Sequence, residues 1–127
     1  MKVSHFGGAE ECRTIEELKT VLSIRYGDEV NEFWISGEEG DSCLAVLVNK
    51  SYANLTYFPK EGSMGFVSIG EGAGLDPNAI SIFYTNTPEE EIEVRNDAVV
   101  PFNIAVEVVM EFFNTRILPK TIKWLEM

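Results

Sequence analysis

The chain has 127 residues, of which 45% are apolar and 24% are charged, a size and composition typical of a single globular domain. Its formal net charge of −11 argues against direct binding to nucleic acid or to an anionic membrane, because both would repel it. No apolar run approaches the ~18 residues of a membrane span, and the first residues lack the apolar stretch of a secretory signal. We therefore expect one domain, residues 1–127, in the cytoplasm.

The first element in chain order is a helix that begins after Thr14. Thr14 and Glu17 have the spacing of a capping box, in which a hydroxyl and a carboxylate satisfy two free amides at the helix start. Ile15, Leu18 and Leu22 follow at helical spacing and give the helix one apolar face, and Gly27 is its expected stop.

From residue 32 to residue 95 the apolar pattern changes to a period of two, which indicates strands joined in a meander. The expected strands are residues 33–35, 43–48, 55–58, 66–69, 80–85 and 92–95. The alternation of apolar and charged residues over 92–95 is typical of a half-exposed edge strand. Because sequential strands with short connections pair antiparallel, the sheet is expected to be mainly antiparallel.

A second helix starts near Pro101, which suits a first helical position. Its apolar stripe runs from Phe102 to Phe113, and residues 121–125 alternate like a final strand. The predicted fold is therefore α+β, a mainly antiparallel sheet of about six to seven strands with two helices packed on it.

The net charge lies in the predicted strands and loops. Residues 28–97 hold fourteen acids and three bases, whereas acids and bases are equal in number over the two flanks. A concentrated negative field of this kind attracts a basic partner.

Candidate catalytic groups do not form a recognisable set. His5 is the single histidine and has no motif around it, so a structural role is favoured over a general base. Ser68 lacks the first glycine of a nucleophile elbow and the helix that would follow it. The acidic run 38–41 is not a calcium loop, and loop solvation is the better interpretation. No catalytic residue, metal site or cofactor is predicted.

Three further features remain, of which the first and the last have two interpretations. The glycine-rich segment 70–74 has the wrong spacing and charge for phosphate binding, which leaves a mobile loop or a partner contact. Cys12 and Cys43 are expected to be free thiols. Trp34 and Trp124 are each expected to pack in the core, with an interface role as the alternative.

The C-terminal third carries a family resemblance. Val99-Val100-Pro101 leads into the helical run Ala105–Phe113, and Pro119 and Ile122-Lys123-Trp124-Leu125-Glu126 follow. This order resembles the type-one immunity-protein family of bacterial polymorphic toxin systems, although that family commonly has a glycine near the position of Thr115. The resemblance implies a non-enzymatic cytoplasmic antidote that binds a cognate toxin domain, often one that acts on nucleic acid, with Phe112 and Trp124 as structural residues.

Charge and resemblance together predict an immunity protein that occludes the basic active-site cleft of a toxin. The residues expected to contact the toxin are Glu38, Glu39, Asp41, Tyr57, Glu71, Asp76, Glu89, Glu90 and Glu91. The alternative is a small non-catalytic α+β module that binds a ligand or pairs the strand 92–95 with another chain. The toxin's identity and the oligomeric state stay open.

Overall fold

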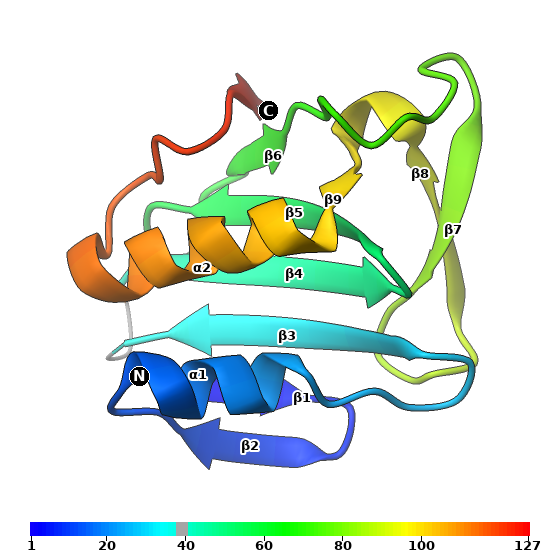
Figure 1. Ribbon diagram of the computed structural model, residues 1–127. Helices are drawn as coiled ribbons and strands as arrows, with labels where there is room; N and C mark the ends of the chain where they lie inside the picture. The colour runs from blue at the N-terminus through cyan, green and yellow to red at the C-terminus, as the bar shows by residue number, and fades with distance from the viewer. Residues whose placement is uncertain (38–40) are drawn as a thin grey trace.

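The computed structural model describes residues 1–37 and 41–127. Within these residues the chain forms a large antiparallel sheet, a separate two-stranded ribbon and two α-helices (Figure 1). The helices are α1 (Ile15–Leu22) and α2 (Phe102–Thr115). The strands are β1 (Lys2–His5), β2 (Gly8–Glu11), β3 (Val30–Ser36), β4 (Cys43–Asn49), β5 (Tyr52–Phe58), β6 (Phe66–Ser68), β7 (Ile80–Tyr84), β8 (Glu91–Arg95), β9 (Val100–Pro101) and β10 (Trp124–Glu126).

The strands of the large sheet follow the order β10-β6-β5-β4-β3-β1-β2, and β9 adds a short pairing to β5. The predicted class, an α+β fold with a mainly antiparallel sheet and two helices, is confirmed. In the described part of the chain the sheet has eight strands, more than the six to seven expected, because the hairpin of β1 and β2 extends one edge and the short strand β9 pairs with β5. The expected final strand, β10, closes the other edge against β6. The seven-residue register of β4 with both β3 and β5 makes β4 the central strand.

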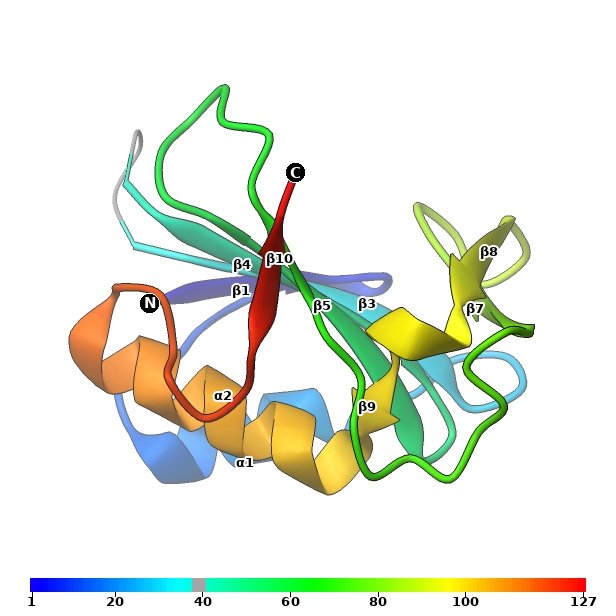
Figure 2. The ribbon, with the colours of Figure 1, turned by 90° about the horizontal axis from the view of Figure 1, so that it is seen from above.

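Both helices cover the same face of the sheet, so the molecule has two layers (Figure 2). The large buried side chains of this interface include Phe33, Ile35, Leu44, Leu55 and Phe112, all below 2% exposed. Alternate strand residues point to opposite faces, so their neighbours along β3, β4 and β5 face away from the helices. The opposite face therefore has no helix over it, and we call it the open face.

The local signals at the start of α1 are confirmed. The Thr14 hydroxyl accepts a hydrogen bond from the Glu17 amide, at 3.1 Å between Oγ1 and N. The helix ends at Leu22, earlier than Gly27, because the Arg25 guanidinium and the Asn31 amide group bind the free carbonyls of Leu22 and Ile24. This early end lets the chain turn into β3.

The helix α2 begins one residue later than predicted, with Pro101 as its N-cap. It ends at Arg116, whose φ of 59° is the left-handed conformation that glycine adopts with least strain. The Ser42 hydroxyl donates to the Arg116 carbonyl at 2.6 Å and so attaches the start of β4 to this end of the helix.

The strands β7 and β8 separate from the main sheet, although the sequence placed them in one meander. They pair only with each other within the described residues, and β7 packs against β3 and β4 (Figure 1). We call residues 80–95, which comprise β7, its turn and β8, the ribbon. The predicted edge character of residues 92–95 is confirmed, since β8 has a partner on one side only.

Glu111 connects α2 to the segment that leads into β10. Its carboxylate accepts hydrogen bonds from the amides of Lys120 and Thr121, at 2.7 and 3.0 Å, and from the Thr121 hydroxyl at 2.6 Å. Burial acts to raise the pKa of Glu111, but these hydrogen bonds and the charge of Lys120 outweigh it, so its pKa lies below the ordinary value.

Replacing Glu111 by glutamine is expected to lower the free energy of unfolding at neutral pH by about 0.5–1 kcal/mol, because the hydrogen bonds lose their charged acceptor at a solvent-screened site. A lowered pKa in the folded state means that the stabilisation is present above the ordinary carboxyl pKa of about 4.3 and is lost as pH falls through the folded value. Urea unfolding of both proteins between neutral and acidic pH measures the difference. A difference that does not shrink in acid would contradict this role of the carboxylate.

Candidate functional site

The open face of the sheet carries an uncharged row of side chains from one edge to the other. The row follows the strand register through Ala9, Ser4, Trp34, Ala45, Thr56, Val67 and Leu125. Trp34 and Leu125 are 41% and 58% exposed. We call these seven residues the open-face row. A contiguous uncharged strip on a protein that is otherwise strongly acidic is the composition expected at the centre of a protein–protein interface.

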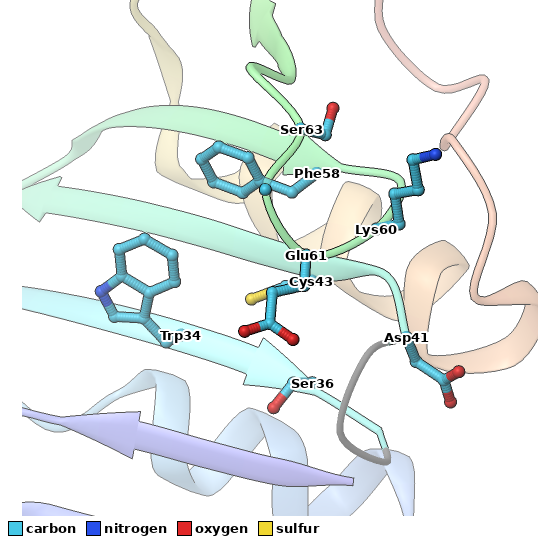
Figure 3. Close-up of a pocket in the computed structure, with 9 residues that line it drawn as sticks. Trp34, Ser36, Asp41, Cys43, Phe58, Lys60, Glu61 and Ser63 are labelled. Carbon is cyan, nitrogen blue, oxygen red and sulfur yellow. The ribbon is translucent and has the colours of Figure 1, made fainter.

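A hollow of about 410 Å³ lies over one part of this row (Figure 3). Its floor is formed by Trp34, Phe58 and Cys43, and its wall is the loop 59–65 together with Asp41. The Trp34 and Phe58 rings are 5.9 Å apart between centroids, with planes within 14° of each other. The expectation that Trp34 packs in the core is therefore wrong. Its neighbours Phe33 and Ile35 take the buried face of β3, which leaves Trp34 on the open one.

Cys43 does not bring reactivity to this hollow. Burial raises the pKa of the Cys43 thiol to about 11, although a hydrogen bond with the Ile35 backbone opposes the shift. The thiolate is the reactive form, so the group is an inert apolar part of the floor at neutral pH. Cys12 and Cys43 are both free, as predicted.

The ribbon stands over the other end of the open face. Figure 2 shows the ribbon and the loop 59–65 rising on the side of the sheet opposite the helices. The register pairs Tyr84 with Glu91 and Ile82 with Glu93, so these four side chains share one face of the ribbon. Phe83, on the other face, is fully buried. The ribbon thus packs through Phe83 and presents carboxylates beside an aromatic ring.

A buried carboxylate holds the turn of the ribbon against the sheet. Glu32 is 8% exposed and projects from β3. Its Oε2 accepts from the Thr85 hydroxyl at 2.7 Å, and its Oε1 accepts from the Asn86 amide at 3.0 Å. The Asn49 side chain also donates to the carbonyl of Ile82 at 2.8 Å. The position of the ribbon therefore depends on polar groups of the open face.

A second hollow of about 640 Å³ lies between the end of the ribbon and the strands β6 and β10. Val67 and Leu125 of the open-face row line it together with Arg95 and Asp97. The Arg95 guanidinium binds the Asp97 carboxylate at 2.9 Å, and Lys50 binds Asp28 at 3.1 Å. Two of the three bases in residues 28–97 are thus already paired with acids.

The acids expected to contact a partner are distributed over several loops. Asp41 lines the first hollow. Glu89, Glu90 and Glu91 are exposed in the ribbon. Glu71 lies 3.9 Å from Lys123, and the Asp76 carboxylate accepts from the Asn78 amide at 2.9 Å, both in the connection between β6 and β7. Glu38 and Glu39 lie outside the described residues. A contact between any of these acids and a partner stays a prediction.

Tyr57 does not fit the role of an aromatic anchor at the surface. It is 5% exposed and packs against Phe66, Phe112 and Trp124. Phe58, its neighbour on the opposite face of β5, lines the first hollow instead. Trp124 packs against the core, as predicted, and its indole nitrogen donates to the Pro119 carbonyl at 2.7 Å.

Two residues of the first hollow, Phe58 and Glu61, were not among the expected contact residues, and Trp34 was named for an interface only as the alternative. The period of two in β3 and β5 was the available signal, since it places Trp34 opposite Phe33 and Phe58 opposite Tyr57. The period alone does not tell which of the two faces the helices cover.

The two side chains considered for catalysis have structural surroundings. His5 Nδ1 lies 3.2 Å from the Tyr26 hydroxyl oxygen and accepts from the Gly7 amide. The Ser68 hydroxyl donates to the Ala98 carbonyl at 2.7 Å and accepts from the Leu55 amide. Over residues 1–37 and 41–127, no three His, Cys, Asp or Glu side chains are grouped to hold a metal ion. No helix in this part of the chain is long and apolar enough to span a membrane.

The glycine-rich segment meets the 96–98 turn through Gly70. The Gly70 amide donates to the Asp97 carbonyl at 2.7 Å. A Cβ atom at this position would overlap the Val99 carbonyl oxygen, so the close approach of the two backbones requires glycine. Gly70 thus has a packing role next to the second hollow.

Comparison with known proteins gives two matches. A family model described as Immunity protein Imm1 matches residues 7–126. The chain is also 27% identical over 127 residues to a Burkholderia cenocepacia (strain H111) protein described as a double-stranded DNA deaminase immunity protein, with 100% of both chains covered. The family match includes both hollows and the ribbon.

Proposed function

Because the chain belongs to the Imm1 family of immunity proteins, we propose that it binds a cognate toxin domain through the open face of its sheet and so neutralises it. The resemblance drawn from residues 99–126 is confirmed by a match that extends over residues 7–126. The relative named for a double-stranded DNA deaminase supports a more specific proposal, that the toxin acts on DNA and is a deaminase.

The observation that carries the proposal is the uncharged row between two acidic borders on the face that no helix covers. A toxin that binds DNA needs a basic groove, because the phosphate backbone contributes most of the affinity. Carboxylates of the ribbon and of the first hollow would meet the rim of that groove, and the open-face row would supply the apolar contact at the centre. Charge complementarity of this kind raises the association rate and selects the partner.

The mechanism is occlusion. The immunity protein occupies the groove that the DNA would enter, so the toxin's catalytic residues stay intact but have no access to substrate. Binding alone is sufficient for this mechanism, and the chain needs neither a catalytic residue nor a cofactor. The site of action is the cytoplasm of the producing cell, where the DNA to be protected lies.

The test is a binding and neutralisation assay with the cognate toxin domain, for which the product of the adjacent upstream gene is the first candidate. We expect co-purification of the two chains, loss of deamination of a double-stranded DNA substrate at equimolar immunity protein, and competition between immunity protein and DNA. The dissociation constant should rise about tenfold between 50 and 300 mM salt, since salt screens exposed charges. Absence of affinity at low salt, or inhibition without competition against DNA, would argue against occlusion.

A further inference from the structure

The two rings of the first hollow form one flat aromatic surface. Strands two positions apart in a sheet lie about 9.5 Å from each other, yet the ring centroids of Trp34 on β3 and Phe58 on β5 are only 5.9 Å apart. The two side chains therefore lean toward each other over β4, where the small residues Cys43 and Ala45 leave room. Figure 3 shows both rings side by side with their faces turned outward. We call this pair the aromatic platform.

Negative charge borders the aromatic platform. Glu61 and Asp41 line the hollow together with one base, Lys60. Figure 3 shows the Glu61 carboxylate directed over Cys43 toward Ser36, whereas the Lys60 ammonium and the Asp41 carboxylate point away from the rings. The charge nearest the platform is thus a carboxylate, which has no ion-pair partner within 4.0 Å among the described residues.

An arginine side chain matches both features at once. The negative face of an aromatic ring attracts a cation, and a planar guanidinium stacks on it while its edge remains free to donate hydrogen bonds. The Glu61 carboxylate is an acceptor for those donors. An apolar side chain would cover the rings but would leave the carboxylate desolvated without a partner, which costs free energy.

We propose that the aromatic platform and Glu61 receive the guanidinium of one arginine on the rim of the toxin's DNA-binding groove. This inference rests on the proposed function and adds to it the residue type at the centre of the contact. An arginine that the toxin uses to bind a DNA phosphate would then be sequestered by stacking and by an ion pair. Trp34 would be the anchor of the interface, in agreement with the frequency of tryptophan and arginine among residues that dominate binding.

The first experiment measures the affinity of three variants for a catalytically inactive form of the upstream-encoded toxin domain. Trp34→Leu keeps an apolar side chain but removes the ring, and we expect about tenfold weaker binding from the loss of the cation–ring contact. Trp34→Phe keeps a ring, so its affinity should fall only two- to threefold. Glu61→Gln removes the charge and should weaken binding about threefold. The matched control is Ile117→Ala, another exposed large apolar residue, 57% exposed and outside the hollow, which should bind like the parent.

The second experiment identifies the arginine by a double-mutant cycle. Single Arg→Lys substitutions in the toxin keep the charge but remove the planar group. One of them should weaken binding of the parent protein and have little further effect on Trp34→Leu, because the two residues form one contact. Additive effects for every arginine would overturn the assignment.

The outcomes separate this inference from the proposed function. If the parent protein binds the toxin but all three variants bind equally well, the platform is not the arginine site and the proposed function stands. If Trp34→Leu and Trp34→Phe lose affinity equally while Glu61→Gln has no effect, the occupant is apolar and the arginine assignment is overturned. If the parent protein has no affinity, the proposed function fails and this inference fails with it.

Discussion

Reversing the charge of Glu89 and Glu91 together is expected to weaken toxin binding about 30-fold at low salt, mainly through slower association, since exposed charges at an interface act mostly on encounter. Both carboxylates are exposed on the ribbon, which stands on the side of the sheet opposite the helices (Figure 2). Glu90 is left unchanged because its carboxylate accepts a hydrogen bond from the Asn86 side chain at 2.7 Å and supports the turn. Stopped-flow association rates across a salt series measure the effect.

The matched control is the double reversal of Glu16 and Glu107, which are exposed on the two helices. Two changes from acid to lysine remove two negative charges and add two positive ones, so both variants have a formal net charge of −7 in place of −11. The helix variant should associate almost as fast as the parent protein. If the association rate falls equally in the two variants, overall charge directs the encounter and the carboxylates of the ribbon have no special role.

Replacing Glu32 by alanine is expected to destabilise the fold by about 2–3 kcal/mol, because the Thr85 hydroxyl and the Asn86 amide lose a charged acceptor in a largely buried place. The ribbon should open locally before the rest of the sheet, since its strands β7 and β8 pair with each other and, within the described residues, with no strand of the main sheet. Urea unfolding gives the global change, and hydrogen exchange at the Thr85 amide, which binds the Glu90 carbonyl, reports the ribbon.

Glu32→Gln provides the comparison for this prediction. Its amide oxygen still accepts one of the two hydrogen bonds, so it should lose about half as much stability as the alanine variant. Toxin affinity should fall in the same order, because the ribbon carries Glu89 and Glu91. If the alanine variant unfolds like the parent protein and binds the toxin normally, Glu32 does not position the ribbon.

Local signals in the sequence predicted most elements, because each depends on residues close together in the chain. Thr14 and Glu17 marked the start of α1, and the apolar stripe marked α2. The hairpin of β1 and β2 was missed because Gly7 and Gly8 interrupt a short polar stretch that has little alternation. Residues 80–95 have the same period of two whether they extend the main sheet or leave it. Their separate position depends on the burial of Phe83 and on the hydrogen bonds of Glu32 to the ribbon turn. Glu32 is distant from that turn in the sequence.

The sequence predicted the charge of the candidate site but not which residues form it. The concentrated negative charge predicts a basic partner, which stays a prediction, and Asp41 lines the first hollow of the open face. Tyr57 was predicted as the aromatic anchor, but it lies on the face of β5 that the helices cover, whereas its neighbour Phe58 lines the first hollow. A shift of one residue exchanges the two faces of a strand, and only the packing of α2 against Tyr57 decides between them.

Chemical labelling of carboxylates in the free protein and in its toxin complex tests most directly whether the toxin covers the open face. Mass spectrometry of the modified peptides gives the protection of each acid. If the toxin covers the open face, we expect strong protection of Glu61, Glu89 and Glu91 and unchanged labelling of Glu16 and Glu107 on the helices. Protection of the helix acids, with Glu61 and the ribbon acids labelled as in the free protein, would contradict it.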